Sequence, residues 1–252
     1  MSKPSGAIDM TRGKPINLML RFALPMMIGS IFQSLYSMVD SAVLGRFVGS
    51  HALAAIGATT STTGLILLLA TGVTSAISIV LSQYVGANDT DRVRKGIVAS
   101  GWITLLLGVV LGLISVFAAR PLMQLLKTPE DVIDMSVLYI QIVCGCGIAQ
   151  FAYNAAASIL RALGDSKTPL YFLILCSILN VILDLISVIG LNMGVAGVAV
   201  ATVGSQAISA AICILVMFRK YPDLMPKRHT LRPDMPVSLK IFGMGAQMAL
   251  QS

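Results

Sequence analysis

Long apolar stretches dominate the pattern of hydrophobic and polar positions along the chain. A helix needs about 20 mostly apolar residues to cross the roughly 30 Å of hydrocarbon in a bilayer. We expect six such spans, at 18–44, 53–85, 96–119, 132–160, 168–189 and 195–218, and a seventh that begins near Val237. Gly, Pro, Asn and Asp punctuate the connections. The pattern predicts an all-α membrane protein, with a lobe of six transmembrane helices plus the start of a seventh helix.

The start of the seventh stretch repeats the start of the first. Segment 239–252 matches segment 20–34 when one residue is deleted. The match follows an even number of spans and a long basic loop, where repeats of transporters commonly join around a central site. We therefore expect an N-lobe over 1–218, a cytoplasmic inter-lobe loop over 219–236, and the start of helix seven of a truncated C-lobe over 237–252.

Composition excludes a soluble domain and a disordered chain. Charged residues make up 12% of the sequence and hydrophobic residues 56%, against roughly 25% charge in ordinary soluble domains. The net charge of +7 does not require a nucleic-acid partner, because the basic residues have another explanation. With the N-terminus inside, all but three of the 18 Lys and Arg lie on the cytoplasmic side; the outer loops hold Arg46, Arg120 and Lys127. The positive-inside rule predicts a multi-pass protein of the cell (plasma or inner) membrane with a cytoplasmic N-terminus.

Two acidic residues do not fit the topology. Nine of the 11 acids, Asp165 among them, lie in loops or at termini, where we expect solvent or its edge. Asp40 and Asp184 lie inside spans, where a carboxylate costs roughly 2.5–3.5 kcal/mol on insertion scales. Asn180 lies four residues before Asp184 on the same helical face, and Thr202 adds an oxygen from the sixth span. Oxygen ligands without sulfur or imidazole suit a hard cation or a proton. The alternative is a structural hydrogen-bond cluster that joins the first and fifth spans.

A polar and aromatic stripe accompanies Asp40. Met26, Gln33 and Tyr36 share one face of the first span with it, and Tyr139 and Asn154 lie at similar depth. This face is suited to a cavity that holds amphipathic organic cations, although helix packing explains each residue equally well. Pro25 should kink the first span, either as a moving part or as an inert bend.

No catalytic pattern is present in the sequence. The chain has no nucleophile–base arrangement, phosphate loop or zinc-ligand spacing, and its four cysteines fall within spans as small packing residues. We therefore expect no enzyme, no catalytic residue and no cofactor other than a coupling ion. Gly108 and Gly112 predict a close helix approach.

Six ordered motifs resemble one transporter family over nearly the whole chain. They are VDSAVLGR at 39–46, LAAIG at 53–57, SQYVGA at 82–87, LRALGDSKTP at 160–169, NVILD at 180–184 and GVAGVAVAT at 194–202. The chain is similar to the N-terminal lobe of the multidrug and toxic compound extrusion (MATE) transporters, in particular the prokaryotic DNA-damage-inducible-protein-F-like branch.

The resemblance implies two six-helix lobes that export cationic or amphipathic compounds in exchange for Na⁺ or H⁺. Positions matching the family's N-lobe cation site are Asp40, Asn180, Asp184 and Thr202. Positions near the family's substrate contacts are Met26, Gln33, Tyr36, Tyr139 and Asn154. The expected partners are the bilayer, the substrate, and the missing C-terminal lobe in cis or a second copy of this half.

Three other functions remain open at this point. A flippase for lipid-linked precursors belongs to the same superfamily, and several Arg in the cavity would favour it. No Lys or Arg lies deep in a predicted span, which favours cationic cargo. A non-transporting multi-pass membrane receptor or scaffold predicts an extracellular N-terminus. A natural half-chain would insert in parallel with a second copy.

Overall fold

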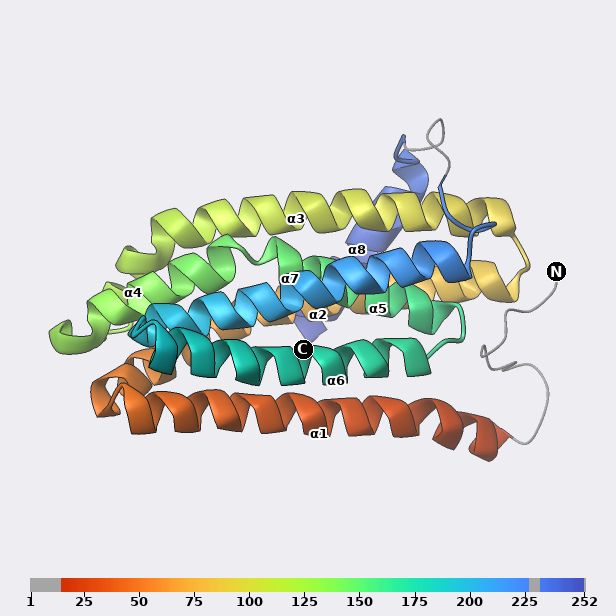
Figure 1. Ribbon diagram of the computed structural model, residues 1–252. Helices are drawn as coiled ribbons and strands as arrows, with labels where there is room; N and C mark the ends of the chain where they lie inside the picture. The colour runs from red at the N-terminus through yellow and green to blue at the C-terminus, as the bar shows by residue number, and fades with distance from the viewer. Residues whose placement is uncertain (1–14, 227–231, 252) are drawn as a thin grey trace.

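The computed structural model describes residues 15–226 and 232–251. Most of the described helices run roughly along one direction as a bundle (Figure 1). The described part holds only helices and connections. The helices are α1 (Pro15–Phe47), α2 (Ser50–Gly86), α3 (Thr90–Leu125), α4 (Glu130–Gly145), α5 (Ile148–Ala162), α6 (Lys167–Asp184), η1 (Leu185–Gly190), α7 (Gly194–Lys220) and α8 (Met235–Gln251).

Four of these elements are long and apolar enough to cross a membrane, namely α2, α3, α6 with η1, and α7. The bent pair α4 and α5 makes a fifth such span when it is counted as one. Helix α1, with 33 residues, is also long enough to cross a bilayer. Since the described α2 has 37 residues, it is about 55 Å long and extends beyond the hydrocarbon layer.

The fourth predicted span, at 132–160, is formed by two helices with a break between them. Helices α4 and α5 meet at an angle of 43° across Cys146 and Gly147. Helix α3 packs against the break through its glycines: a Cβ on Gly112 would lie 2.9 Å from the carbonyl oxygen of Gly145, and one on Gly108 would lie 3.0 Å from Ile148. The predicted close approach of Gly108 and Gly112 is confirmed, and the partner is the bend itself.

The fifth predicted span changes from an α-helix to a π-helix before it ends. The α-helix α6 ends at Asp184, and the wider π-helical segment η1 continues to Gly190. Gly197 of α7 packs closely there, because a Cβ on it would lie 3.1 Å from the Cβ of Ser187. The absence of a side chain at Gly197 therefore lets α7 fit against the widened segment beside Asp184.

Helix α8 packs against the six-span bundle through α2 and α3. It crosses the other helices steeply (Figure 1). The crossing depends on two glycines: a Cβ on Gly72 would lie 2.7 Å from the carbonyl oxygen of Gly245, and a Cβ on Gly245 would lie 3.0 Å from Val73 Cα. The largest buried apolar cluster continues from α2, α3, α5 and α7 into α8, so the predicted start of helix seven shares the core of the first lobe.

Candidate cation and substrate site

The four residues predicted to bind a cation come from three helices, α1, α6 and α7, and lie inside the bundle. Helix α6 presents Asn180 and Asp184 one turn apart, and they are 1% and 0% exposed. Thr202 of α7 is buried, and its Oγ1 accepts a hydrogen bond from Asn180 Nδ2 at 3.5 Å. Asp40 of α1 is half-buried and lies close enough to Asp184 for the two carboxyl groups to influence each other electrostatically.

The oxygens of this cluster lack protein donors. Both carboxyl oxygens of Asp184, Oδ1 of Asp40 and Oδ1 of Asn180 are buried without a hydrogen-bond partner among the described residues. Leaving buried polar groups unpaired costs about 1–3 kcal/mol each, and more when the group is charged. A cation or a proton placed among these oxygens would remove much of that cost. The chemistry of these oxygen ligands therefore fits Na⁺ or H⁺.

No larger metal-ligating group appears elsewhere in residues 15–226 and 232–251. Those ranges hold no cluster of three or more His, Cys, Asp and Glu side chains. Cys144, Cys176 and Cys213 are buried free thiols, and Cys146 is exposed at the α4–α5 break. The Asp40–Asp184 cluster is thus the arrangement here whose oxygens suit a hard ion.

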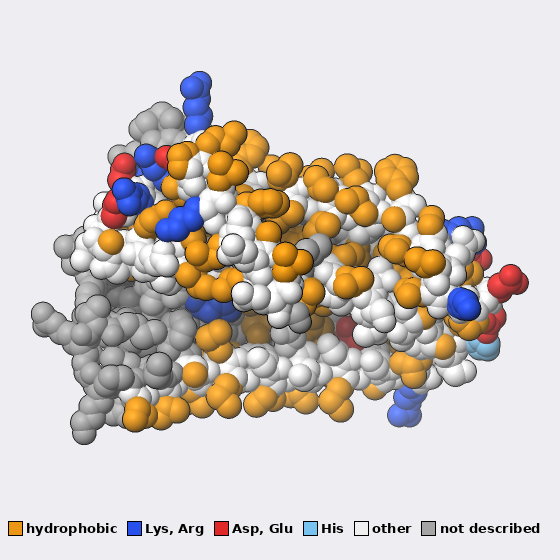
Figure 2. Space-filling view, turned by 180° about the vertical axis from the view of Figure 1, so that it is seen from behind, with side chains coloured by type: hydrophobic (Ala, Val, Ile, Leu, Met, Phe, Trp, Pro, Cys, Tyr) orange, Lys and Arg blue, Asp and Glu red, His pale blue; other side chains and the backbone are white. Residues whose placement is uncertain are grey.

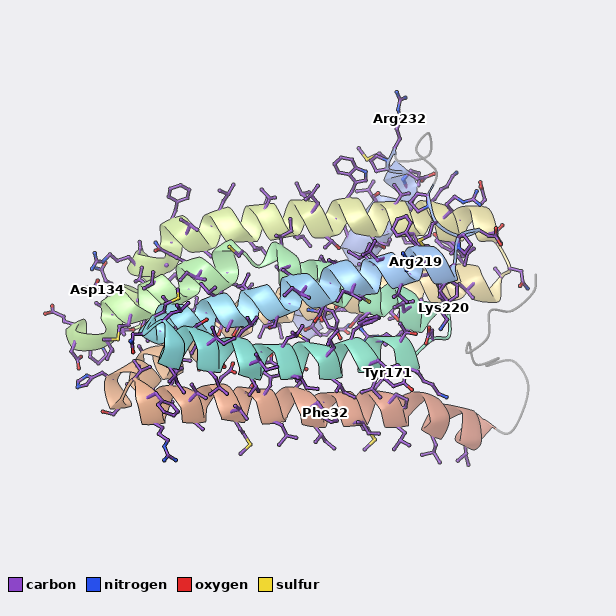
Figure 3. The ribbon with its side chains drawn as sticks, in the orientation of Figure 1. Phe32, Asp134, Tyr171, Arg219, Lys220 and Arg232 are labelled. Carbon is purple, nitrogen blue, oxygen red and sulfur yellow. The ribbon has the colours of Figure 1, made fainter. Side chains whose placement is uncertain are left out.

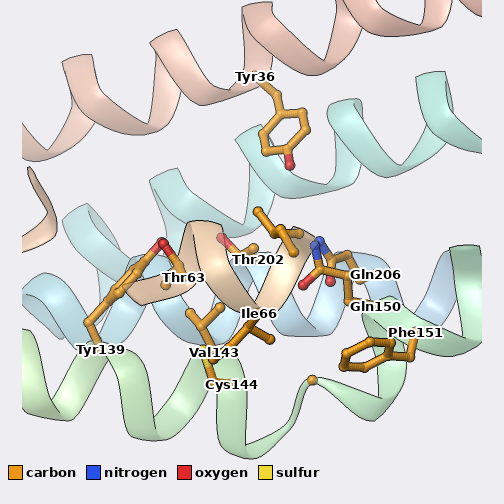
Figure 4. Close-up of a pocket in the computed structure, with 12 residues that line it drawn as sticks. Tyr36, Thr63, Ile66, Tyr139, Val143, Cys144, Gln150, Phe151, Thr202 and Gln206 are labelled. Atoms are coloured by element: carbon orange, nitrogen blue, oxygen red, sulfur yellow. The ribbon is translucent and has the colours of Figure 1, made fainter. Parts of the chain in front are cut away.

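A cavity of about 120 Å³ lies next to the cluster and includes Thr202 in its wall. Tyr36 of α1 and Tyr139 of α4, two of the predicted substrate-binding residues, line it as well. Figure 4 shows Tyr36 pointing from α1 toward the other lining residues. Gln150 and Gln206 also line the cavity, and they were not predicted from the sequence. Their signal was available, because an amide inside an apolar span is costly unless it has a partner.

The other predicted substrate residues lie elsewhere. Met26 and Gln33 line a second cavity, of about 140 Å³, together with Pro25. Asn154 is half-buried on α5 and lines neither of these two cavities. The structure thus divides the predicted stripe of α1 between two cavities. Helix α1 runs through Pro25 as one helix.

Asp165 corrects the expectation that loop acids lie in solvent or at its edge. It is 1% exposed and accepts a hydrogen bond from Lys220 Nζ at 2.6 Å. The backbone N–H and the hydroxyl of Thr168 donate to it at 3.1 and 2.6 Å, and the hydroxyl of Tyr221 donates at 3.4 Å. Figure 3 shows Lys220 at one end of the bundle and Asp134 at the other. The hydrogen bonds of Asp165 therefore hold the loop between α5 and α6 to the end of α7.

The fold and the central cluster define a class of protein. Long apolar helices that bury two interacting carboxyl groups beside a cavity are typical of multi-pass membrane transporters. The chain belongs to the MatE family, whose profile matches residues 25–186. It is 31% identical over 247 residues to a probable multidrug resistance protein, YpnP, of Bacillus subtilis (strain 168), covering 97% of this chain and 55% of that protein.

Solved structures agree with this assignment. An outward-facing multidrug resistance MATE family transporter of the MOP superfamily superimposes with a TM-score of 0.90 at 25% identity, covering 99% of this chain and 55% of that chain. A MOP superfamily transporter from Pyrococcus furiosus, described as having a binding pocket of reverse polarity, matches with the same TM-score, identity and coverage. The predicted family and the all-α N-lobe fold are confirmed. The chain spans about half the length of these relatives.

Proposed function

We propose that the chain is the N-terminal half of a cation-coupled antiporter that exports cationic or amphipathic organic compounds across the cell membrane. One observation carries the proposal: Asp184 is fully buried beside Asp40, and both its carboxyl oxygens lack a protein donor. If this position served only for helix packing, an apolar side chain would suffice, and the cost of a carboxylate at this depth would be avoided. An ion that enters and leaves explains why the carboxylate has no permanent partner.

Asp40, Asn180, Asp184 and Thr202 are the proposed ligands of the coupling ion. Sodium would take oxygen ligands from the two carboxylates, the Asn180 carbonyl and the Thr202 hydroxyl. A proton would be shared between the two carboxyl groups, because like charges in one site favour protonation. Either ion would tie α1 to α6 through Asp40 and Asp184.

Thr202 links this ion site to the substrate cavity. It accepts a hydrogen bond from Asn180 and lines the cavity with Tyr36 and Tyr139. Aromatic faces beside a carboxylate attract an organic cation. A cation at Asp40 and Asp184 neutralises the charge that attracts such a substrate, so the two ligands would favour different states. Exchange requires only that the ion and the substrate each bind the two conformations of the transporter with different affinity.

The orientation and partners are part of the same proposal. The N-terminus lies in the cytoplasm and the six spans are in the cell membrane, as the distribution of basic residues indicates. Of those basic residues, Lys3, Arg12, Lys14, Lys227 and Arg228 lie outside the described residues. A second lobe, supplied in cis or by a second copy, closes the substrate path. Nucleic acid has no role.

The test is gradient-driven efflux of a dye cation from vesicles containing the full-length protein. The variants are Asp40→Asn, Asp184→Asn, and Asp91→Asn as a control on an acid that is 76% exposed. We expect each of the first two to reduce efflux at least tenfold, a loss of about 1.4 kcal/mol or more, and the control to leave it unchanged. Imposing a Na⁺ gradient and a proton gradient separately identifies the ion. Intact efflux in both variants would refute the site.

A flippase for a lipid-linked precursor is the second candidate function. The observation that favours it is Arg161, a basic residue that lines the second cavity. Its position near the end of α5 agrees with the expectation that no Lys or Arg lies deep in a span. Transport of a lipid-linked anion in vesicles, with no efflux of the dye cation, would support this candidate over the first.

A further inference from the structure

A second cavity lies between α1, α5 and the start of α6, at the end of the bundle near Lys220. Its volume is about 140 Å³, and one water molecule needs about 10–15 Å³. It therefore has room for a group of several heavy atoms. Arg161 and Ser166 line it together with Gln33 of α1, and Leu170 and Leu173 supply an apolar part of the wall. None of the lining residues carries a negative charge.

Arg161 has no carboxylate partner among the described residues. Its Nη2 donates a hydrogen bond to Ser158 Oγ at 2.9 Å, and the ion pairs of the described residues do not include it. The nearest acid in sequence, Asp165, is held by Lys220 at 2.6 Å instead. A guanidinium has five N–H donors, so most of those of Arg161 remain available to a ligand.

Ser166 supplies a second, independent indication of a ligand. Its side chain is 4% exposed, and its Oγ has no hydrogen-bond partner in the described structure. A buried hydroxyl without a partner is costly, and this one lines the same cavity as Arg161. The hydroxyl of Tyr153, by contrast, is already committed to the carbonyl oxygen of Pro169 at 3.1 Å. The uncommitted groups of the cavity are therefore the Arg161 guanidinium and the Ser166 hydroxyl, and both can donate hydrogen bonds.

We propose that this cavity binds a phosphate oxyanion, with Arg161 and Ser166 donating to its oxygens and Leu170 and Leu173 contacting the apolar part of its carrier. Phosphate suits the site because guanidinium N–H groups bind its oxygens in pairs. The phosphate can belong to a lipid headgroup or be free. The site is distinct from the cation site, since Gln33, the residue of its wall nearest to Asp40 along α1, precedes Asp40 by seven residues, about 10 Å along a helix.

The surface of the molecule has basic and acidic regions that are separate from one another (Figure 2). Figure 2 shows a hollow on the face seen from behind, in which recessed basic surface and recessed acidic surface lie apart from one another. Asp40, Asn180, Asp184 and Thr202 do not line the second cavity, so an anion held there would not compete directly with a cation at that cluster. The proposal stands independently of export, because it concerns binding alone.

The test measures binding to the purified full-length protein by thermal unfolding in phosphate-free detergent buffer. A ligand that binds the folded state raises the unfolding temperature with its concentration. The probes are inorganic phosphate, phosphatidylglycerol, and a glycolipid without phosphate. The variants are Arg161→Gln, Arg161→Lys and Ser166→Ala. Arg219→Gln is the control, because Arg219 is an exposed arginine at the same end of the bundle (Figure 3).

We expect at least one phosphate-bearing probe to stabilise the wild type, with apparent affinity about tenfold weaker in Arg161→Gln and a few-fold weaker in Ser166→Ala. Arg161→Lys should lie between, and Arg219→Gln should match the wild type. Stabilisation by inorganic phosphate identifies a free anion, and stabilisation by phosphatidylglycerol alone identifies a lipid. If Arg161→Gln fails to fold, the apparent phosphate affinities of Ser166→Ala and Arg161→Lys test the proposal in its place.

Three results would overturn the proposal. They are no stabilisation by either phosphate-bearing probe, equal stabilisation of the wild type and the variants, and equal stabilisation by the phosphate-free glycolipid. Asp184→Asn separates this site from the proposed export function. It should reduce cation-coupled efflux at least tenfold and leave phosphate binding unchanged.

Discussion

Asp184 and Asp165 are two aspartates with the same burial and opposite surroundings. Asp184 is 0% exposed and Asp165 is 1% exposed. Asp165 receives hydrogen bonds from Lys220, Thr168 and Tyr221. Both oxygens of Asp184 have no partner among the described residues. Burial alone therefore does not distinguish a structural acid from a functional one.

The two aspartates differ in the source of the positive charge that compensates them. At Asp165 the protein supplies it permanently through Lys220, so the ion pair serves to hold the α5–α6 connection to the end of α7. At Asp184 the nearest charged neighbour is another acid, Asp40. Two acids without a donor need an ion or a proton from outside. The first region should therefore matter for stability and the second for transport.

The largest stability effect should come from removing the compensated acid. Asp165→Asn breaks the pair with Lys220, and we expect it to lower the free energy of unfolding by about 1–3 kcal/mol, because the exposure of Lys220 reduces the cost below that of a fully buried pair. Asp184→Asn should leave stability unchanged or raise it, since it removes a buried carboxylate without a partner. Thermal unfolding in detergent micelles compares the two. Equal destabilisation by both variants would break the comparison.

A pH series should sharpen the comparison further. Burial by itself raises the pKa of Asp165, but the hydrogen bonds from Lys220 and Thr168 outweigh it and hold the pKa below its ordinary value of about 3.9. The folded state thus binds this proton less readily than the unfolded state does. The pair stabilises fully above about pH 5, and its contribution is lost as pH falls below about 4.

The measurement is the difference in unfolding temperature between wild type and Asp165→Asn at several pH values. It should stay constant from neutral pH to about 5 and shrink below about 4. Asp91→Asn, at an acid that is 76% exposed, serves as the matched control. A difference that grows as pH falls would contradict the sign of the pKa shift.

The smallest effect should come from the weakest partner of Asp165. The hydroxyl of Tyr221 donates at 3.4 Å, against 2.6 Å for Lys220. Tyr221→Phe should therefore cost about 0.5 kcal/mol. Tyr171→Phe provides the control, because Tyr171 is 65% exposed. A loss as large as that of Asp165→Asn would mean that Tyr221, and not Lys220, is the main partner.

Local pattern predicted the helices well because each is a long apolar run with polar ends. The first span was expected at 18–44 and the helix is Pro15–Phe47. The predicted glycine contact of α3 also holds, since it depends only on small side chains at Gly108 and Gly112. The break at Cys146 and the π-helical turn after Asp184 were missed. Both arise where a neighbouring helix packs against the segment, and apolar periodicity does not record that.

What the sequence determined by itself is the position of each polar group along a membrane-spanning helix, because hydrocarbon penalises charge wherever the chain crosses it. That principle alone selected Asp40 and Asp184. Only the tertiary structure decided which buried groups receive a counter-charge. Lys220 is 55 residues from Asp165, and Arg161 lies four residues from the same aspartate without pairing to it. Electrostatic compensation depends on distance in space, so the fold decides which acid is a structural partner and which is left for an ion.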